Sequence, residues 1–113
     1  MSVELLTIGT ELLLGQIVDT NASWMAQRLA EAGIDVFYKS TVGDNWGRIE
    51  AAIRLAMSRA DVVIMTGGLG PTEDDLTREV LAAVTDRPLR LDAAVLRHIE
   101  ERFRRFGRTM TPS

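Results

Sequence analysis

The sequence predicts one α/β domain over residues 1–113, in which helices cover both faces of a mostly parallel sheet. Three observations support this class. Apolar, strand-like runs alternate with segments of helical periodicity, as in parallel α/β sheets. The strongest strand pattern, residues 61–66, contains an unbroken apolar run, as expected for a strand buried on both faces. With 113 residues, 46% hydrophobic and 26% charged, the chain has the size and composition of a single globular domain.

The first half of the chain predicts a strand, a long connection and a helix. Residues 3–8 are mostly apolar and form the first expected strand. Thr20 or Asn21 is expected to cap the next helix, because a short side-chain oxygen accepts an otherwise unpaired N–H. Apolar residues recur at helical spacing over 22–30, and Gly33 suits the position after the helix, where a positive φ is accessible to glycine.

The remaining elements continue the alternation. Residues 35–42 predict the second strand, and a clear apolar stripe predicts a helix around 49–57. The third strand, 61–66, is followed by a helix expected from about residue 73 to 84. A last helix is expected over 93–106, with Leu96, Ile99, Phe103 and Phe106 on its inner face.

Right-handed crossovers restrict the topology of such a chain. We expect the strand order 2-1-3, with the first strand in the centre. The chain then leaves the central strand in two directions, and the carboxyl ends of the strands open a crevice, which is the usual ligand site of open α/β sheets. The loops at this edge are residues 9–21 and 67–77, with Asp44 directly after the second strand.

Composition excludes several functions. The net charge of −3 gives no positive field to attract a phosphate backbone, so we expect no nucleic-acid partner. No apolar run approaches the roughly 20 residues needed to cross a bilayer, so we expect no membrane association. The absence of cysteine and of a basic leader segment favours a cytoplasmic location. His98 is the only histidine and Lys39 the only lysine, so a Ser-His-Asp triad and a P-loop are both disfavoured.

The glycine-rich loop after the third strand is the leading candidate site. Glycines let backbone N–H groups approach a ligand closely, and a helix N-terminus adds unpaired donors and partial positive charge. Together they favour phosphate binding. The alternative is that the glycines only form a tight strand-to-helix turn. The candidate ligand-binding residues here are Thr66, Gly67, Gly68, Gly70, Thr72 and Thr77.

Carboxylates beside a phosphate site would repel the ligand unless a cation lies between them. A divalent cation, Mg²⁺ by preference, bridges carboxylate and phosphate oxygens. Asp75 is a candidate catalytic and metal-binding residue, although Thr72 and Asp75 also have the spacing of a capping box. Asp44 is a second candidate, with an N-cap or turn role as its alternative, and Asp74 is a weaker metal candidate. The first loop adds the candidate ligand contacts Gly9, Thr10, Glu11 and Asn21.

Three motifs together resemble one family. They are residues 8–21, residues 41–45 and the glycine loop over 66–77. In order and spacing they resemble the CinA family (competence/damage-inducible protein A), over essentially the whole chain. The glycine loop also resembles the wider molybdopterin-binding fold, which includes the MoaB/MogA molybdenum-cofactor proteins and gephyrin. MogA-like loops commonly have threonine where this chain has Leu69, which favours the CinA-like members.

The resemblance implies a three-layer α/β/α fold of the MogA type and a homo-oligomer, dimer or trimer. It assigns functional aspartates to Asp44 and Asp75. It also implies metal-dependent hydrolysis of nucleotide pyrophosphates such as ADP-ribose. The family's separate amidase domain is absent from these residues, so we expect no amidase. CinA-like domains continue into further strands, so residues 1–113 are expected to be truncated at the C-terminus.

Three functions therefore remain in competition. The first is an ADP-ribose pyrophosphatase-type hydrolase. The second is a molybdopterin-binding or adenylylating protein with a pterin ligand. The third is a non-catalytic nucleotide-binding module. The first loop and Leu69 favour the first of these, and the short C-terminal end favours the third.

Overall fold

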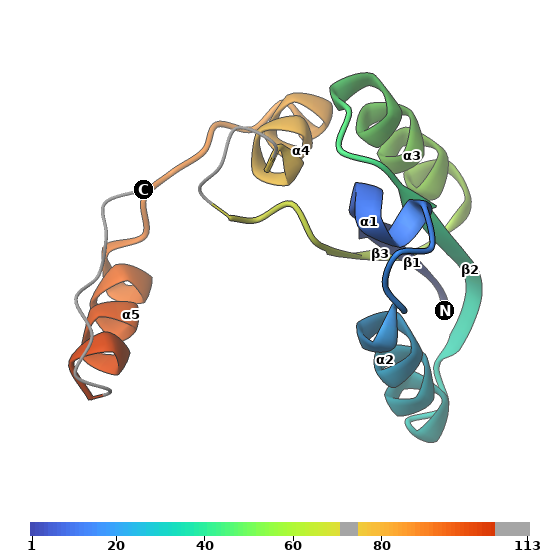
Figure 1. Cartoon of the computed structure of the whole chain (residues 1–113), viewed down its shortest axis with the longest axis horizontal. Helices are drawn as coiled ribbons and strands as arrows, with labels where there is room; N and C mark the ends of the chain where they lie inside the picture. Colours follow the sequence, from blue (N-terminus) through green and yellow to red (C-terminus); the bar gives the residue numbers. More distant parts are fainter. Residues whose placement is uncertain (71–74, 106–113) are drawn as a thin grey trace.

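A computed structural model describes residues 1–70 and 75–105. It contains a parallel three-stranded sheet in the order β2-β1-β3, as the sequence predicted. Figure 1 shows α2 on one side of the sheet and α3 on the other. The elements are β1 (Ser2–Ile8), α1 (Thr10–Leu13), α2 (Thr20–Glu31), β2 (Asp35–Val42), α3 (Trp46–Arg59), β3 (Val62–Thr66), α4 (Thr77–Thr85) and α5 (Ala93–Arg105).

The central strand β1 contributes four of the nine buried apolar residues in the described part of the chain, more than any other element there. Leu5 and Leu6 are both 0% exposed although they point to opposite faces of the sheet. One face packs on α3 and α4, and the other packs on α2, so the predicted three-layer arrangement is confirmed. The buried residues of the two apolar clusters are Leu6, Ile8, Ile49, Ile53 and Val80 on the first face, and Val3, Leu5 and Ala22 on the second.

Several predicted boundaries need correction. Asp19, not Thr20 or Asn21, caps α2: its Oδ1 accepts the N–H of Ala22 at 3.0 Å, and the helix already begins at Thr20. The long connection after β1 contains the short helix α1, which the sequence analysis did not predict. Helix α4 begins at Thr77 rather than near residue 73.

The last helix also departs from expectation. Figure 1 shows α5 standing apart from the sheet and its covering helices. Ile99, expected on an inner face, is 38% exposed, and Val95 is 52% exposed. The predicted inward placement of Phe103 and Phe106 lies outside the side chains that the structure describes. No helix in the described ranges has both the length and the apolar character needed to span a bilayer.

A buried carboxylate at the amino end of β1 was not predicted. Glu4 is 1% exposed and forms two hydrogen bonds with the Arg59 guanidinium, at 2.8 and 3.1 Å. Ser40 donates a third, at 3.0 Å. A β-bulge in β2 pairs Glu4 with Tyr38 and leaves Phe37 unmatched, and the Tyr38 ring lies 3.8 Å from the guanidinium carbon of Arg59. The hydrogen bond from Arg59 to Glu4 raises the pKa of Arg59.

We predict that Arg59→Leu lowers the free energy of unfolding by about 3 kcal/mol, because it leaves the Glu4 carboxylate buried without its counterion. The double variant Glu4→Leu/Arg59→Leu should recover most of this loss. Arg54→Leu is the matched control, since it breaks an exposed ion pair with Glu50 and should cost less than about 1 kcal/mol. Urea unfolding measures all three. Equal losses for Arg59→Leu and Arg54→Leu would contradict the prediction.

A second polar contact links Ser2, the first residue of β1, to Asp61, directly before β3. Asp61 accepts the Ser2 N–H at 2.8 Å and the Ser2 hydroxyl at 3.2 Å, and these bonds lower the pKa of Asp61. A lowered pKa means that folding favours the charged carboxylate. The stabilisation is therefore complete above the ordinary pKa of about 3.9 and is lost as the pH falls through the lower folded value.

Accordingly, Asp61→Asn should lower the thermal unfolding midpoint at pH 7 and should lower it less at pH 3. Asp35→Asn, an exposed aspartate at the start of β2, removes the same charge without this contact and serves as the control. Thermal melts of both variants and the parent at the two pH values provide the comparison. A loss for Asp61→Asn that is independent of pH would argue against the assigned contact.

Candidate functional site

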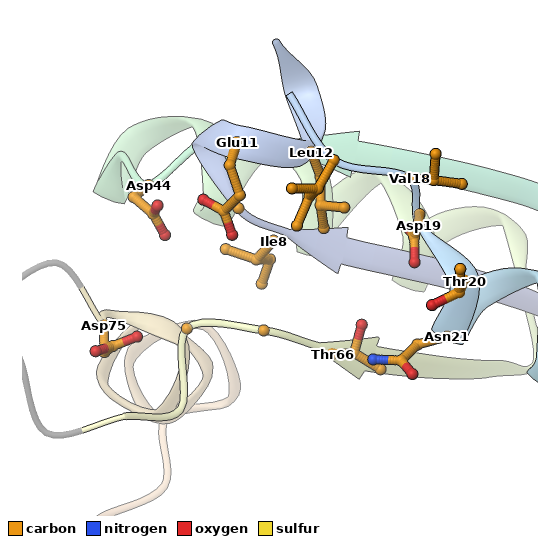
Figure 2. A pocket seen from close by; sticks show the side chains of 14 residues that line it. Ile8, Glu11, Leu12, Val18, Asp19, Thr20, Asn21, Asp44, Thr66 and Asp75 are labelled. Carbon is orange, nitrogen blue, oxygen red and sulfur yellow. The ribbon is translucent and has the colours of Figure 1, made fainter. Parts of the chain in front are cut away.

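A pocket of about 490 Å³ lies at the carboxyl ends of the strands (Figure 2). It is built by the segments that follow β1, β2 and β3, at the edge where the sequence placed the crevice. It brings together residues from four separate parts of the chain. Of the predicted site residues, those lining it are Gly9, Glu11, Asn21, Asp44, Thr66, Gly67, Gly68 and Asp75.

Backbone geometry requires the first two glycines of the loop. Gly67 has φ +92° and Gly68 has φ +66°, both in the region that disfavours other residues. A Cβ on Gly67 would overlap the carbonyl oxygen of Ile8, and one on Gly68 would overlap the Thr77 hydroxyl. The tight-turn interpretation therefore explains these two glycines, and it leaves open what their amides bind.

Thr77 fixes the direction of the N–H groups of Gly68 and Leu69. Its hydroxyl donates to the Gly67 carbonyl at 2.6 Å, and its N–H donates to the Gly68 carbonyl at 3.2 Å. In a trans peptide the C=O and the following N–H point in opposite directions, so the N–H groups of Gly68 and Leu69 point away from Thr77. In the described residues, no hydrogen bond starts at the N–H of Gly67, Gly68 or Leu69. These donors remain available to a ligand.

Asp44 is held by the first residue of α1. Its Oδ2 accepts the N–H of Thr10 at 3.2 Å and the Thr10 hydroxyl at 3.3 Å, while its own N–H donates to Thr10 Oγ1 at 3.1 Å. Asp44 does not cap α3, because Asn45 does so by accepting the N–H of Arg48 at 3.1 Å. The N-cap interpretation of Asp44 is therefore wrong, and its carboxylate lines the pocket instead.

Asp75 reaches the pocket from the segment before α4. The residue at the N-cap position of α4 is Leu76, so Asp75 precedes this helix, and Thr72, the other half of the expected capping box, lies outside the described residues. Its carboxylate packs against Gly70, where an added Cβ would lie 2.8 Å from Asp75 Oδ2. Figure 2 shows Asp75 and Asp44 at the same end of the pocket, on segments that approach it from opposite sides.

Some predicted residues support the site instead of lining it. Thr10, Gly70 and Thr77 are not among the lining residues, and each contacts or fixes one that is. Thr72 and Asp74 lie outside the described residues. Sequence reasoning missed Asp19, which lines the pocket while capping α2. Its position directly before a helical pattern was the available indication, because aspartate is a preferred N-cap.

The charge of the pocket restricts its ligands. Four carboxylates line it, and the described lining residues include no lysine or arginine. Nowhere in the described ranges do three or more His, Cys, Asp or Glu side chains group closely enough to hold a metal ion. Mg²⁺ is typically held by one or two carboxylates together with ligand phosphates. The donor set is compatible with a cation that binds together with an anionic ligand. The carboxylates are Glu11, Asp19, Asp44 and Asp75.

Comparison with protein families matches residues 4–113 to the family described as "Probable molybdopterin binding domain". A competence-damage inducible protein of Geobacillus sp. (strain WCH70) is 52% identical over 98% of this chain and 27% of its own length. A CinA-like protein of Anaeromyxobacter sp. (strain Fw109-5) is 51% identical over 100% of this chain and 28% of its own. The chain thus spans about a quarter of these relatives.

Solved structures show the same relationship. The CinA protein of Thermoplasma acidophilum, described as having unknown function, matches with a TM-score of 0.81 and 35% identity, over 98% of this chain and 64% of that one. The molybdopterin biosynthesis enzyme MoaB of Thermus thermophilus matches with a TM-score of 0.71 and 26% identity, over 98% and 67%. Both structures confirm the expected MogA-type α/β/α fold.

We predict that Gly67→Ala lowers the free energy of unfolding by about 3 kcal/mol, because it combines an unfavourable φ with a clash against the Ile8 carbonyl. Gly33→Ala is the matched control. Gly33 has φ +77° but open space around its Cβ position, so it should lose only about 1 kcal/mol from backbone strain. Urea unfolding compares them, and equal losses would show that the close approach is unimportant.

Proposed function

Since the chain belongs to the family of probable molybdopterin binding domains, and its relatives at about half identity are CinA-like, we propose that it hydrolyses nucleotide pyrophosphates such as ADP-ribose with a divalent cation. One observation carries this proposal. Unpaired amides of the glycine loop and carboxylates of two other loops line the same pocket. A diphosphate is a ligand that can use both, provided that a cation bridges it to the carboxylates.

The amides of Gly67 and Gly68, which line the pocket, would bind the diphosphate. Thr77 holds the Gly67 carbonyl, so the N–H of Gly68 is oriented before a ligand arrives. Because no described basic side chain lines the pocket, backbone donors and the cation would have to provide all of the positive potential. This explains why a site for a doubly charged anion can contain several carboxylates.

Asp44 and Asp75 would hold Mg²⁺, with Asp74 as a further candidate outside the described residues. When bound, such an ion polarises a phosphoryl oxygen and lowers the pKa of a coordinated water. The two aspartates would also orient the water that attacks phosphorus. Thr10 steadies Asp44 through one of its carboxylate oxygens, and in the described residues no hydrogen bond engages the other, Oδ1.

Molybdopterin binding is the second candidate. It is supported by the family and by the MoaB neighbour at 26% identity. A molybdopterin carries a phosphate that the same amides could bind, so the phosphate end of the pocket does not separate the two functions. A homo-oligomer, dimer or trimer, stays a prediction under either function.

We expect ADP-ribose to yield AMP and ribose 5-phosphate in the presence of Mg²⁺ and no product after chelation. Asp44→Asn and Asp75→Asn should each lower kcat/KM by about 100-fold or more, because each removes a charge from the cation site. Asp35→Asn, exposed at the other end of the sheet, is the control and should not change the rate. Chromatography of the products measures all four proteins.

The alternatives give different outcomes in the same assay. Turnover that is unchanged in both aspartate variants would reject their assigned roles. Binding of ADP-ribose by calorimetry without any product would indicate a non-catalytic nucleotide-binding module. Binding of molybdopterin without turnover of ADP-ribose would favour the second candidate.

A further inference from the structure

The segments that follow β1 and β2 are joined beside the pocket by several contacts. The N–H of Gly9 donates to the Val42 carbonyl at 2.9 Å. Thr10 and Asp44 then form three hydrogen bonds with each other, of 3.1 to 3.3 Å. Gly43 permits this close approach, because an added Cβ would lie 3.3 Å from Thr10 Oγ1. The Asp44 side chain is therefore held at a fixed place at the edge of the pocket.

These hydrogen bonds use the two oxygens of Asp44 unequally. Oδ2 accepts both the N–H and the hydroxyl of Thr10. Because the N–H of Asp44 donates to Thr10 Oγ1, the hydroxyl proton of Thr10 is directed to the carboxylate. A carboxylate oxygen has about two lone-pair sites, so both sites of Oδ2 are occupied. In the described residues no hydrogen bond engages Oδ1, which is the oxygen that Asp44 offers to the pocket.

A carboxylate with one available oxygen discriminates between divalent cations. Ca²⁺ takes more oxygen ligands than Mg²⁺ and commonly uses both oxygens of a carboxylate to reach that number. Mg²⁺ is smaller, requires octahedral geometry and keeps several of its waters, so one oxygen from each carboxylate is sufficient. Asp44 lies at the end of the pocket where Asp75 also lies (Figure 2). An Asp44 restricted to Oδ1 therefore suits the smaller ion at that end.

We propose that Thr10 is a positioning residue, which restricts Asp44 to one coordinating oxygen and thereby gives the pocket a preference for Mg²⁺ over Ca²⁺. This inference rests on the cation site of the proposed function and adds which divalent ion that site selects. It does not depend on the reaction that follows binding. Thr10 acts through Asp44 and is absent from the lining residues, as this role requires.

Competition for the cation site measures the preference without turnover. The probe is Mn²⁺, which like Mg²⁺ binds octahedral oxygen sites and whose bound fraction is followed by electron paramagnetic resonance. An α,β-methylene analogue of ADP-ribose, which cannot be hydrolysed at the pyrophosphate, provides the anionic ligand. Mg²⁺ and Ca²⁺ are added separately as competitors, and the ratio of the Ca²⁺ to the Mg²⁺ dissociation constant is the preference. Titrations without protein correct for metal bound by the analogue alone.

Thr10→Val is the test variant, because valine replaces the hydroxyl of threonine with a methyl group. It frees one lone-pair site of Oδ2, so Asp44 can offer both oxygens to Ca²⁺. We expect the ratio of the two dissociation constants to fall by about 10-fold, at the lower end of the change in metal affinity that outer-shell substitutions cause. Thr10→Ser keeps the hydroxyl and should keep the ratio of the unchanged chain.

Thr41→Val is the matched control. The Thr41 hydroxyl forms a hydrogen bond of 2.9 Å with the Thr7 hydroxyl, between β2 and β1. The substitution makes the same chemical change close to the same edge of the sheet, and the hydrogen bond that it removes does not involve Asp44. It should leave the ratio unchanged.

The outcomes separate this inference from the proposed function. A lower ratio in Thr10→Val alone supports the inference, whether or not ADP-ribose is hydrolysed. An unchanged ratio in Thr10→Val would mean that Thr10 only joins the two segments, and an unchanged chain that does not prefer Mg²⁺ would also overturn the inference; in both cases the proposed hydrolysis stands. No binding of Mn²⁺ with the analogue would overturn both. If Thr10→Val does not fold, Thr10→Ala removes the same hydroxyl and should show the same fall.

Discussion

Burial of β1 between two parallel neighbours and two layers of helix is the constraint on which the rest of the structure depends. Its inner residues are fully buried, so its register against β2 and β3 is fixed by packing on both faces. Because the strands are parallel, their carboxyl ends lie at one edge. The segments that follow them must turn there, and this places Asp44 and the glycine loop beside the same pocket.

Residues outside the pocket hold several of the residues that line it. Thr77 binds the carbonyls of the glycine loop, and Thr10 binds the carboxylate of Asp44. Gly70 provides the space in which the Asp75 carboxylate lies. These contacts fix the orientation of the pocket's donors and acceptors before any ligand binds.

The acidic residues at the two ends of β1 have different surroundings. At the amino end, Glu4 is fully paired with Arg59 and Ser40, and Tyr38 covers the guanidinium. At the carboxyl end, the pocket carboxylates meet no basic side chain among the described lining residues. A carboxylate paired inside the protein contributes to the structure, whereas Asp19 and Asp44, which form no ion pair with the described residues, can attract a cation from solution or from a ligand. This contrast supports the choice of the carboxyl end of the sheet as the candidate site.

The sequence by itself determined the class of fold, the strand order and the edge of the sheet that carries the site. Periodicity and glycine positions report local preferences, and a parallel crossover pattern leaves few topologies, so Asp44, Asp75 and the glycine loop could be assigned to one crevice from residues alone. Only the tertiary structure decided the role of each group. The burial of Glu4, the hold of Thr10 on Asp44 and the unpaired oxygen of Asp19 depend on contacts between residues far apart in the chain or on enclosure by several segments. The sequence pattern of one segment contains no information about long-range contacts or about enclosure by other segments.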